Sequence, residues 1–338
     1  MSPLRWLALL GILVAVACGG GGDGGEPPQQ LTDRLLLVRD TGIFELSLAT
    51  NEEQPLLLDP PGALLADPAV SPDGTQIAHV RLLQGVAQPG EQADFGADLY
   101  VAGRDGSDAR LLYEHQVRGE QARGPRWTPD GMLLFSVERF ETDHFVTQIL
   151  ALDLASGETT VLVENAVQPA ISPDGTQIAY AAIDDQGLQS LWLANAGGGD
   201  PRLLLGPDQG LGIILSPRFS PDGTRVAVAG SEVVPPAARH DDPLYASQTG
   251  GTRPLRRPPA YLYNGFPMDI WLVELATGEP LKLADIDADQ PYLAWSADGL
   301  RLFMLDATGV YVIDPTTGNG RALAPGTFHG QLDWLAAQ

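Results

Sequence analysis

Short runs of alternating apolar and polar residues, separated by turns rich in Gly, Asp and Pro, cover the chain from about residue 31 onward. One phrase recurs: SPDGTQIA stands at 71–78 and again at 172–179, and SPDGTRVA stands at 220–227. Pro-Asp-Gly favours a tight turn because Pro presets φ and Gly accepts a positive φ. Apolar and β-branched residues flank the turn, so each copy predicts a β-hairpin.

The hairpin phrase occurs five times, with its turn aspartate at Asp73, Asp130, Asp174, Asp222 and Asp298. A second apolar strand pair follows each copy, and a sixth such pair, within 34–58, lacks a first strand. Residues 330–338 supply that strand, with Trp334 at the position that Trp127 and Trp295 take in their copies. We therefore expect an all-β chain, a six-bladed β-propeller closed by pairing of its N- and C-terminal strands, because closure removes open sheet edges. Another all-β array, such as a sandwich, is the alternative, and the three tryptophans are expected in the core between blades.

The five turns, each S/T-P/A-D-G, and the I/V-A that follows several of them resemble the WD40-like PD40 repeat, known from the C-terminal propeller of TolB and from prolyl-oligopeptidase relatives. The resemblance covers about residues 31–338 and implies the propeller fold without naming a function. It does not carry over a peptidase activity, because the chain has no G-x-S-x-G turn. It does not carry over the role of TolB either, because a short tether stands where TolB has a further domain.

The first residues have the pattern of an export signal. Arg5 precedes an apolar run from Trp6 to Ala17 that is too short to span a membrane, and Ala15-Val16-Ala17-Cys18 resembles a bacterial lipobox. We expect residues 1–17 to be a lipoprotein signal peptide, Cys18 to carry lipid, 18–30 to be a Gly-rich tether and 31–338 to be the propeller. An ordinary signal peptide is the alternative. The protein is then exported and lipid-anchored to a bacterial membrane, on its periplasmic or outer surface.

The chain is strongly acidic, with a formal net charge of −23. This charge argues against binding of nucleic acid or of anionic lipid through bulk electrostatics. Cys18 is the only cysteine, so no intrachain disulfide can form. We expect a monomer that touches the membrane only through its N-terminal lipid.

Two connections between the second and third strands of a blade are enlarged: Gln84–Ala97 in the second blade and Ser231–Pro267 in the fifth. In a six-membered ring these blades stand opposite each other, so both insertions are expected at one rim. The larger insertion carries one net positive charge and seven prolines. Arginine and aromatic residues on a stiffened loop suit partner recognition; a solvated loop packing its tyrosines on the ring is the alternative. The candidate binding residues are Arg253, Arg256, Arg257, Tyr261 and Tyr263.

Other candidate chemistry is weaker. Asp285, Asp287 and Asp289 have the spacing of the first half of a calcium loop, but Gln290 replaces the required Gly, so a polar connection entering the next blade is expected. The turn aspartates fit turn geometry better than catalysis. No catalytic residue, metal ligand or cofactor is assigned, because none of the five histidines forms a metal-binding pair: His79, His115, His144, His240 and His329.

The sequence favours a non-catalytic binding or scaffold module for a protein, peptide or glycan at the cell envelope. The alternative is a propeller enzyme, a lyase or hydrolase, with acidic or histidine side chains converging in the channel. A channel lined by small apolar residues would exclude the enzyme, whereas histidine clustered with Asp or Glu would favour it.

Overall fold

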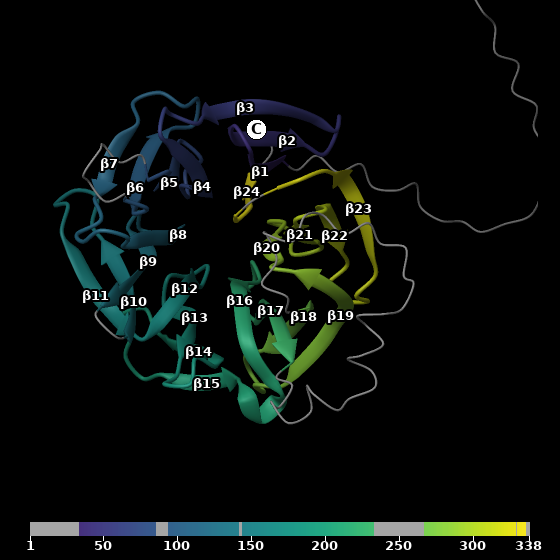
Figure 1. Ribbon diagram of the computed structural model, residues 1–338. Helices are drawn as coiled ribbons and strands as arrows, with labels where there is room; N and C mark the ends of the chain where they lie inside the picture. The colour runs from purple at the N-terminus through teal and green to yellow at the C-terminus, as the bar shows by residue number, and fades with distance from the viewer. Residues whose placement is uncertain (1–33, 86–93, 142–143, 233–266, 329, 336–338) are drawn as a thin grey trace, which may run out of the picture. The chain divides into compact units, whose positions relative to one another are not determined.

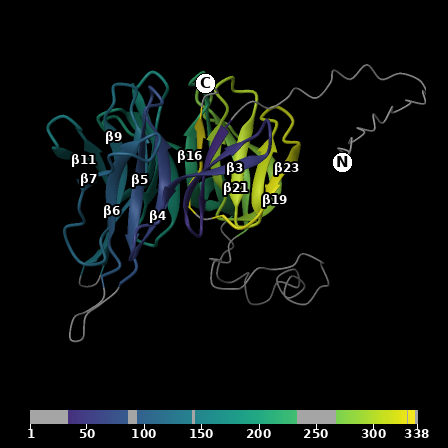
Figure 2. The same ribbon diagram turned by 90° about the horizontal axis from the view of Figure 1, so that it is seen from above.

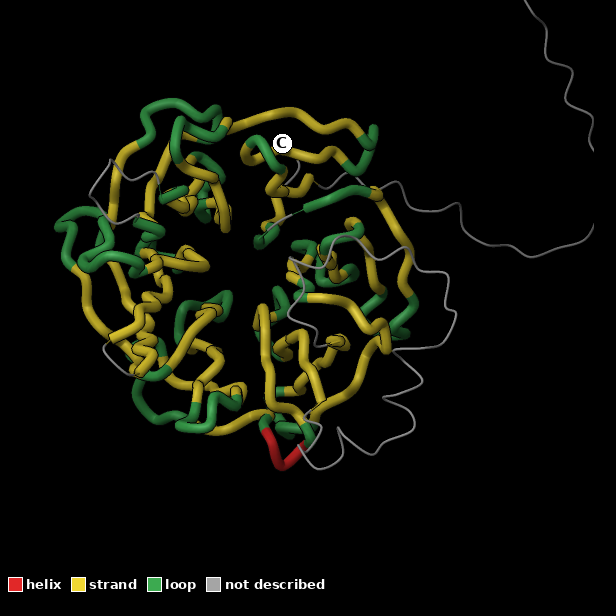
Figure 3. Tube along the Cα trace, in the orientation of Figure 1, coloured by secondary structure: helices red, strands yellow, loops and turns green. Residues whose placement is uncertain are grey.

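The computed structural model describes residues 34–85, 94–141, 144–232, 267–328 and 330–335. In these ranges the regular structure is β-strand throughout, apart from one turn of 3-10 helix, η1 (Pro207–Gln209), seen in red in Figure 3. The all-β prediction is confirmed. None of the helical structure in these ranges is long or apolar enough to cross a membrane.

The strands form antiparallel groups of four, each following the chain order. One group takes its first strand from the far end of the sequence: β24 (Asp333–Leu335), β1 (Arg34–Arg39), β2 (Gly42–Ser47) and β3 (Glu52–Leu58). The next two groups are β4 (Ala63–Val70), β5 (Gln76–Leu83), β6 (Ala97–Gly103) and β7 (Arg110–Tyr113), then β8 (Gln121–Trp127), β9 (Leu133–Glu141), β10 (His144–Leu152) and β11 (Thr159–Glu164). A single parallel bridge from Ala97 to Gln121 joins these two groups into one eight-stranded sheet.

Three four-stranded sheets complete the described part of the chain. They are β12 (Ala166–Ile171), β13 (Gln177–Ile183), β14 (Gln189–Asn195) and β15 (Arg202–Leu205); β16 (Leu211–Phe219), β17 (Arg225–Glu232), β18 (Pro267–Glu274) and β19 (Pro280–Asp289); and β20 (Tyr292–Trp295), β21 (Leu302–Asp306), β22 (Gly309–Ile313) and β23 (Gly320–Pro325). The groups are called sheets one to six below, beginning with the group that contains β1.

The first strand of each sheet contacts the first strand of the next. Contacts run from β24 to β4, β8, β12, β16 and β20 in turn, and from β20 back to β24. Figure 1 shows these six strands facing one another, with the remaining strands of each sheet farther out, and Figure 2 shows the sheets side by side. β24 also pairs with β1, with Trp334 opposite Leu35 and Asp333 opposite Leu36.

The repeated phrase forms the predicted hairpins. In the copy between β4 and β5, Asp73 accepts hydrogen bonds from the Ser71 hydroxyl at 2.6 Å and from the Thr75 amide at 3.0 Å. Gly74 has φ of +70°, a value that a side chain disfavours. The same bonds recur at the copies around Asp174 and Asp222, so local turn chemistry positions these first and second strands.

The first strands share an irregular step just before their Pro-x-apolar segment. The residue preceding the proline has a positive φ, and the strand register shifts there in β4, β8, β12 and β16. A positive φ is unfavourable for a residue with a side chain, so neighbouring contacts must hold it. These residues are Asp67, Gly124, Gln168 and Ser216; Gln290 and Gly330 also have a positive φ, but they precede β20 and β24 rather than lying within them.

Apolar side chains fill the spaces between neighbouring sheets. Ile77 of β5 packs with Leu36 of β1, and Phe303 of β21 packs with Leu35, all four fully buried. The three tryptophans pack against such clusters as predicted. The ring nitrogens of Trp127 and Trp295 also donate to main-chain oxygens of the preceding first strand, at 3.1 Å and 3.3 Å.

Two details differ from the sequence prediction. Asp285 and Asp289 lie within β19, which reaches Asp289, so the segment is an extended strand rather than a connection. The alternation of apolar and acidic residues in DIDAD has the strand period, and pairing with β18 extends it. β9 and β10 each contain nine residues, so their hairpin is long, although no insertion marks it in the sequence.

Candidate functional site

Charged and polar side chains gather where the first strands face one another. We call this group the axial cluster: Asp67, Arg123, Arg126, Glu138, Arg218, Tyr292, Gln331 and Asp333. All but Glu138 and Gln331 lie on first strands; Glu138 lies on β9, and Gln331 just precedes β24.

Two carboxylates of the axial cluster, Asp67 and Asp333, form hydrogen bonds that link neighbouring sheets. Asp67 accepts main-chain N–H groups from Gly124 at 3.1 Å and from Gln331 at 3.3 Å, so it joins sheet two to sheets three and one. Asp333 accepts the Val70 amide at 2.8 Å and the Trp334 amide at 3.0 Å. Buried polar groups need such partners, and these bonds hold the positive φ of Asp67.

Uncharged side chains form hydrogen bonds of the same kind between the sheets on the other side of the cluster. The Ser136 hydroxyl accepts the Gln168 amide at 2.8 Å, and the Gln168 side chain accepts the Ser216 amide at 2.5 Å. The Ser216 hydroxyl in turn accepts the Leu293 amide at 2.9 Å. Each bond crosses from one sheet to the next, so the residue before the proline is an inter-sheet connector.

Two arginines of the axial cluster converge on one amide. Arg126 of β8 and Arg218 of β16 both donate from Nη2 to the side-chain oxygen of Gln331, in the second case at 3.0 Å. Each also donates from Nη1 to the carbonyl of its preceding proline, at 2.9 Å and 2.7 Å. Two first strands that are not neighbours, β8 and β16, are therefore joined to the segment before β24 at a single oxygen atom.

Burial shifts the pKa of several groups in the axial cluster. It lowers the pKa of Arg126, against the attraction of Asp333 and Asp67. It raises the pKa of Glu138, against the attraction of Arg123, and it raises the pKa of Asp333. Burial also raises the pKa of Tyr292, with Asp67 adding to the shift. Each shift disfavours the charged form, which is the effect of removing a charge from water.

A second feature lies at the opposite edge from the SPDG turns, at the stems of the two insertions. Asp98 of β6 and Asp269 of β18 occupy the same position in their sheets, shortly after each insertion. The corresponding residues of the other sheets have no acidic side chain: Gly42, Gln148, Ser190 and Gly309. Each aspartate accepts a main-chain N–H, from His115 and from Ile286 respectively, both at 2.9 Å.

A basic side chain completes each stem. His115 contacts Asp98 through Nδ1 at 2.6 Å and Asp94 through Nε2 at 3.0 Å, and Asp94 belongs to the first insertion. Burial alone lowers the pKa of His115, but the bonds to Asp98 and Asp94 outweigh it, so the pKa is raised. In sheet five, Lys282 lies 2.7 Å from Asp269 and 3.6 Å from Glu232, which precedes the larger insertion. The bond to Asp269 raises the pKa of Lys282 to about 12.

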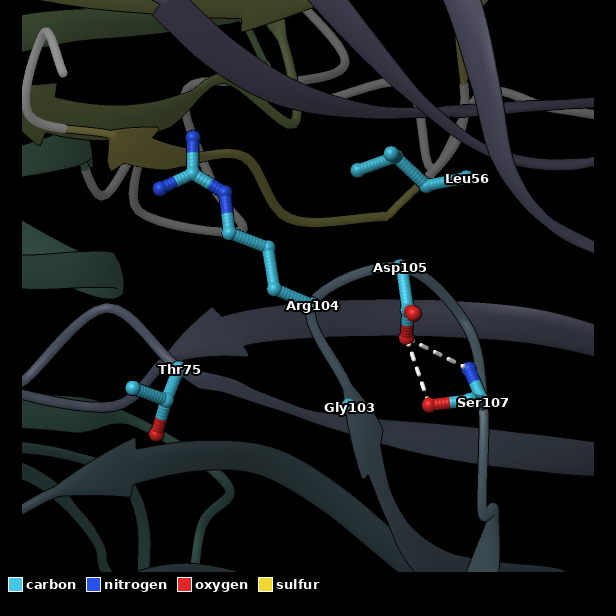
Figure 4. A pocket seen from close by; sticks show the side chains of 6 residues that line it. All are labelled: Leu56, Thr75, Gly103, Arg104, Asp105 and Ser107. Atoms are coloured by element: carbon cyan, nitrogen blue, oxygen red, sulfur yellow. Dashed lines mark hydrogen bonds between the residues drawn. The ribbon is translucent and has the colours of Figure 1, made fainter.

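An open hollow of about 510 Å³ lies between sheets one and two at the edge with the SPDG turns (Figure 4). Arg104 and Asp105 line it, and the Asp105 carboxylate is already bonded to the Ser107 hydroxyl and amide. A second hollow occupies the corresponding place in sheet four, around Thr176 and Asn195. Because such a hollow recurs beside the same turns of another sheet, we interpret it as a feature of the repeat rather than as a ligand site.

The predicted site residues fall outside the described part of the chain. This holds for Cys18 and for the five candidates of the larger insertion, Arg253, Arg256, Arg257, Tyr261 and Tyr263, so their roles remain predictions. Among the described residues, no group of three or more His, Cys, Asp or Glu side chains is arranged to hold a metal ion. The sequence analysis missed the axial cluster, although the repeated x-Pro-x-apolar segments marked the strands that carry it.

A channel of small apolar side chains would have excluded an enzyme, and histidine clustered with Asp or Glu would have favoured one. The axial cluster matches neither description. It is charged rather than small and apolar. His79 lies in β5, where it is fully buried, and His115 lies at the stem of the first insertion. Burial lowers the pKa of His79 to about 4. The axial cluster contains arginine, carboxylate and tyrosine side chains together with Gln331, and neither of these histidines belongs to it.

No protein-family model matches the chain, and no curated protein matches its sequence. Solved structures do resemble it. TolB from Acinetobacter baumannii superposes with a TM-score of 0.61 at 15% identity, over 91% of this chain and 67% of that one. A putative TolB from Agrobacterium tumefaciens gives a TM-score of 0.58 at 16% identity, over 90% and 98%.

An oligogalacturonate lyase in complex with manganese has a TM-score of 0.51 at 16% identity, over 84% of this chain and 70% of the lyase. At such identities these likenesses concern the fold alone. Together with the strand order and the contacts of the first strands, they show that the described residues form a TolB-like β-propeller.

Proposed function

We propose that this chain is an exported, lipid-anchored β-propeller of six blades that binds a protein, peptide or glycan partner at the cell envelope. The six sheets are its blades, and the pairing of β24 with β1 closes the ring. Cys18 carries the lipid, and the Gly-rich residues after it tether the propeller to the membrane.

The paired stems are the observation that carries the binding role. Only sheets two and five place an aspartate at the stem position, and these are the sheets that bear insertions. Each aspartate accepts a main-chain N–H from a neighbouring segment and bonds a basic side chain at the base of its insertion. Functional loops are commonly presented on a rigid scaffold. Such anchoring supports a recognition edge that both insertions share.

Two of the three axial carboxylates support a binding module over a propeller enzyme. Asp67 and Asp333 each use both carboxylate oxygens to accept main-chain N–H groups. A general base must be free to take a proton from substrate. These two groups act instead as structural connectors between sheets.

Deletion of residues 233–266, joined by a short Gly-Ser linker, tests the recognition edge. Partners are captured from envelope extracts with the full-length protein and with the deletion, after circular dichroism has shown that both are folded. We expect the deletion to lose specific partners that the full-length protein retains. The same partners at the same yield with both proteins would contradict the proposal.

Lipidation is tested separately. Cells that express the protein are labelled with a fatty-acid analogue, and the Cys18→Ser variant is the matched control. We expect label on the native chain and none on the variant. Equal label on both chains would contradict anchoring through Cys18.

A further inference from the structure

The guanidinium groups of Arg126 and Arg218 meet at an acceptor that carries no charge. Both donate to the Gln331 side-chain oxygen, and their other acceptors are the carbonyls of Pro125 and Pro217. Two like charges at one neutral oxygen repel each other, and the repulsion is larger where water is scarce. An amide oxygen neutralises neither charge.

Arg126 is the more deeply buried of the two, with only 8% of its surface exposed. Its Nε–H has no hydrogen-bond partner among the residues that the structure describes. Buried charges in proteins are normally paired, because an unpaired charge loses its hydration without compensation. Asp67 and Asp333 attract Arg126. Their oxygens, however, are bonded to main-chain N–H groups, and within the described residues no carboxylate lies within 4.0 Å of the guanidinium.

The position of Gln331 indicates which group would satisfy both arginines. A carboxylate is planar like the amide and matches its shape, but it brings a negative charge to the same place. Bonds from arginine to a carboxylate are stronger than bonds to a neutral oxygen. Gln331 lies outside the strands, directly after Gly330 with φ of +63°, and Arg218, which donates to it, is only partly buried.

We propose that Arg126 and Arg218 form a binding site for a carboxylate group of the ligand, which displaces the Gln331 amide from between them. The inference rests on the proposed binding function and deepens it, because it adds a ligand class and a second point of contact on the axis. A carboxylate oxygen takes the two Nη2 donors, and the unpartnered Nε–H of Arg126 is available to the second oxygen.

The test measures thermal unfolding of the full-length protein in sodium succinate and in sodium tricarballylate. Sodium chloride at matched ionic strength is the control, and sodium phosphate is the comparison anion. A ligand that binds only the folded state raises the unfolding temperature with the logarithm of its concentration. We expect the carboxylates to raise it above the chloride value. Equal curves in carboxylate and chloride, or a larger rise in phosphate, would overturn the inference.

Three variants locate the effect. Gln331→Glu places a carboxylate of the chain between the arginines, so we expect a higher unfolding temperature at neutral pH and at least a tenfold weaker response to succinate. Arg218→Gln should also weaken the response at least tenfold. Arg321→Gln, on the outer strand β23, should keep it. A native response in both Gln331→Glu and Arg218→Gln would overturn the site.

The same measurement separates this inference from the proposed function. Deletion of residues 233–266 removes the larger insertion and leaves the two arginines in place, so the response to succinate should persist in it. Should succinate fail to bind while the deletion still abolishes partner capture, the carboxylate site is refuted and the recognition edge stands. Should succinate bind while capture is unaffected by the deletion, the recognition edge is refuted instead.

Discussion

His115 and Lys282 both bond the stem aspartate of their sheet, but they respond to pH differently. Each bonds the stem aspartate of its sheet and a second carboxylate near an insertion. Lysine keeps its charge over the physiological range, whereas histidine changes charge near neutrality. The stem of the first insertion is therefore the pH-sensitive one.

We expect the first stem to loosen as pH rises. The pKa of His115 is raised, so its stabilisation is complete below the ordinary histidine pKa and is lost as pH rises through the higher folded value. Hydrogen exchange measures this at the Gly96 and Gly119 amides, which both bond Asp94. Their protection factors should fall from acidic to mildly alkaline pH, while the Ile286 amide at the second stem stays protected.

His115→Gln is the control for that experiment. Glutamine keeps hydrogen-bonding capacity but cannot carry the positive charge, so the variant should show low protection at Gly96 and Gly119 at every pH. A native pH profile in this variant would assign the effect to another group.

Glu138 gives a second pH-dependent prediction, because burial disfavours the charged form of its carboxyl group. Its pKa is raised, so burial favours the protonated form and native stability decreases as pH rises through the folded value. Glu138→Gln removes this penalty. We expect the unfolding temperature of the variant, relative to the native protein, to increase between pH 4 and pH 7. A constant difference over that range would show that Arg123 compensates the charge fully.

The turn elements show why the hairpins could be predicted from the sequence. Within each repeated phrase, the aspartate, the serine and the following amides bond one another over five residues or fewer. Such chemistry is local and is therefore readable from the sequence. Asp98 and Asp269 can be read from the sequence just as easily, but their basic partners, His115 and Lys282, come from other parts of the chain.

Asp174→Ala should destabilise the protein, because the aspartate accepts bonds from Ser172 and Thr176 that hold the hairpin between β12 and β13. The Ser172 bond is the main cause of the lowered pKa of Asp174, so its contribution is present above the ordinary aspartate pKa and is lost as pH falls through the folded value. Urea unfolding should show a deficit at pH 7 that shrinks near pH 3. Asp185→Ala, at an exposed residue of the next hairpin, is the matched control.

Element lengths were harder to predict where no Gly or Pro marks a boundary. The strands β9 and β10 are long, although no insertion in the sequence marks their hairpin. Phe140 and Phe145 lie opposite each other near its tip, and both side chains are largely exposed. β19 was expected to end before the acidic residues, but pairing with β18 continues it to Asp289. In both cases a tertiary partner decided the outcome.

On the scale of the molecule, the axial cluster depends on residues that are distant in sequence. Arg126 and Gln331 are 205 residues apart, and nothing local to either indicates that they meet. The sequence predicted the repeat and the strand from the C-terminal end. That Arg126 and Arg218 meet at Gln331 becomes evident only once the first strands are placed face to face. The sequence also does not indicate that the two arginines share a neutral acceptor.

Removing residues 330–338 should weaken the whole propeller. The truncation eliminates the pairing of β24 with β1, the bond from Val70 to Asp333 and the Gln331 amide between the arginines. It also exposes the edge of β1, which invites aggregation. Calorimetry should show a lower and less cooperative transition. Removal of residues 336–338 alone is the control, and an unchanged transition in the longer truncation would contradict closure by this segment.

Photo-crosslinking in intact cells tests the central claim, recognition at the edge that bears the insertions, most directly. A photoreactive amino acid replaces Phe95 or Phe140 near that edge, or Leu300 in an SPDG-type turn at the opposite edge; all three side chains are exposed. We predict partner adducts from the first two positions, lost on deletion of residues 233–266, and none from Leu300. Adducts from Leu300 alone, or equal adducts from both edges, would contradict the account.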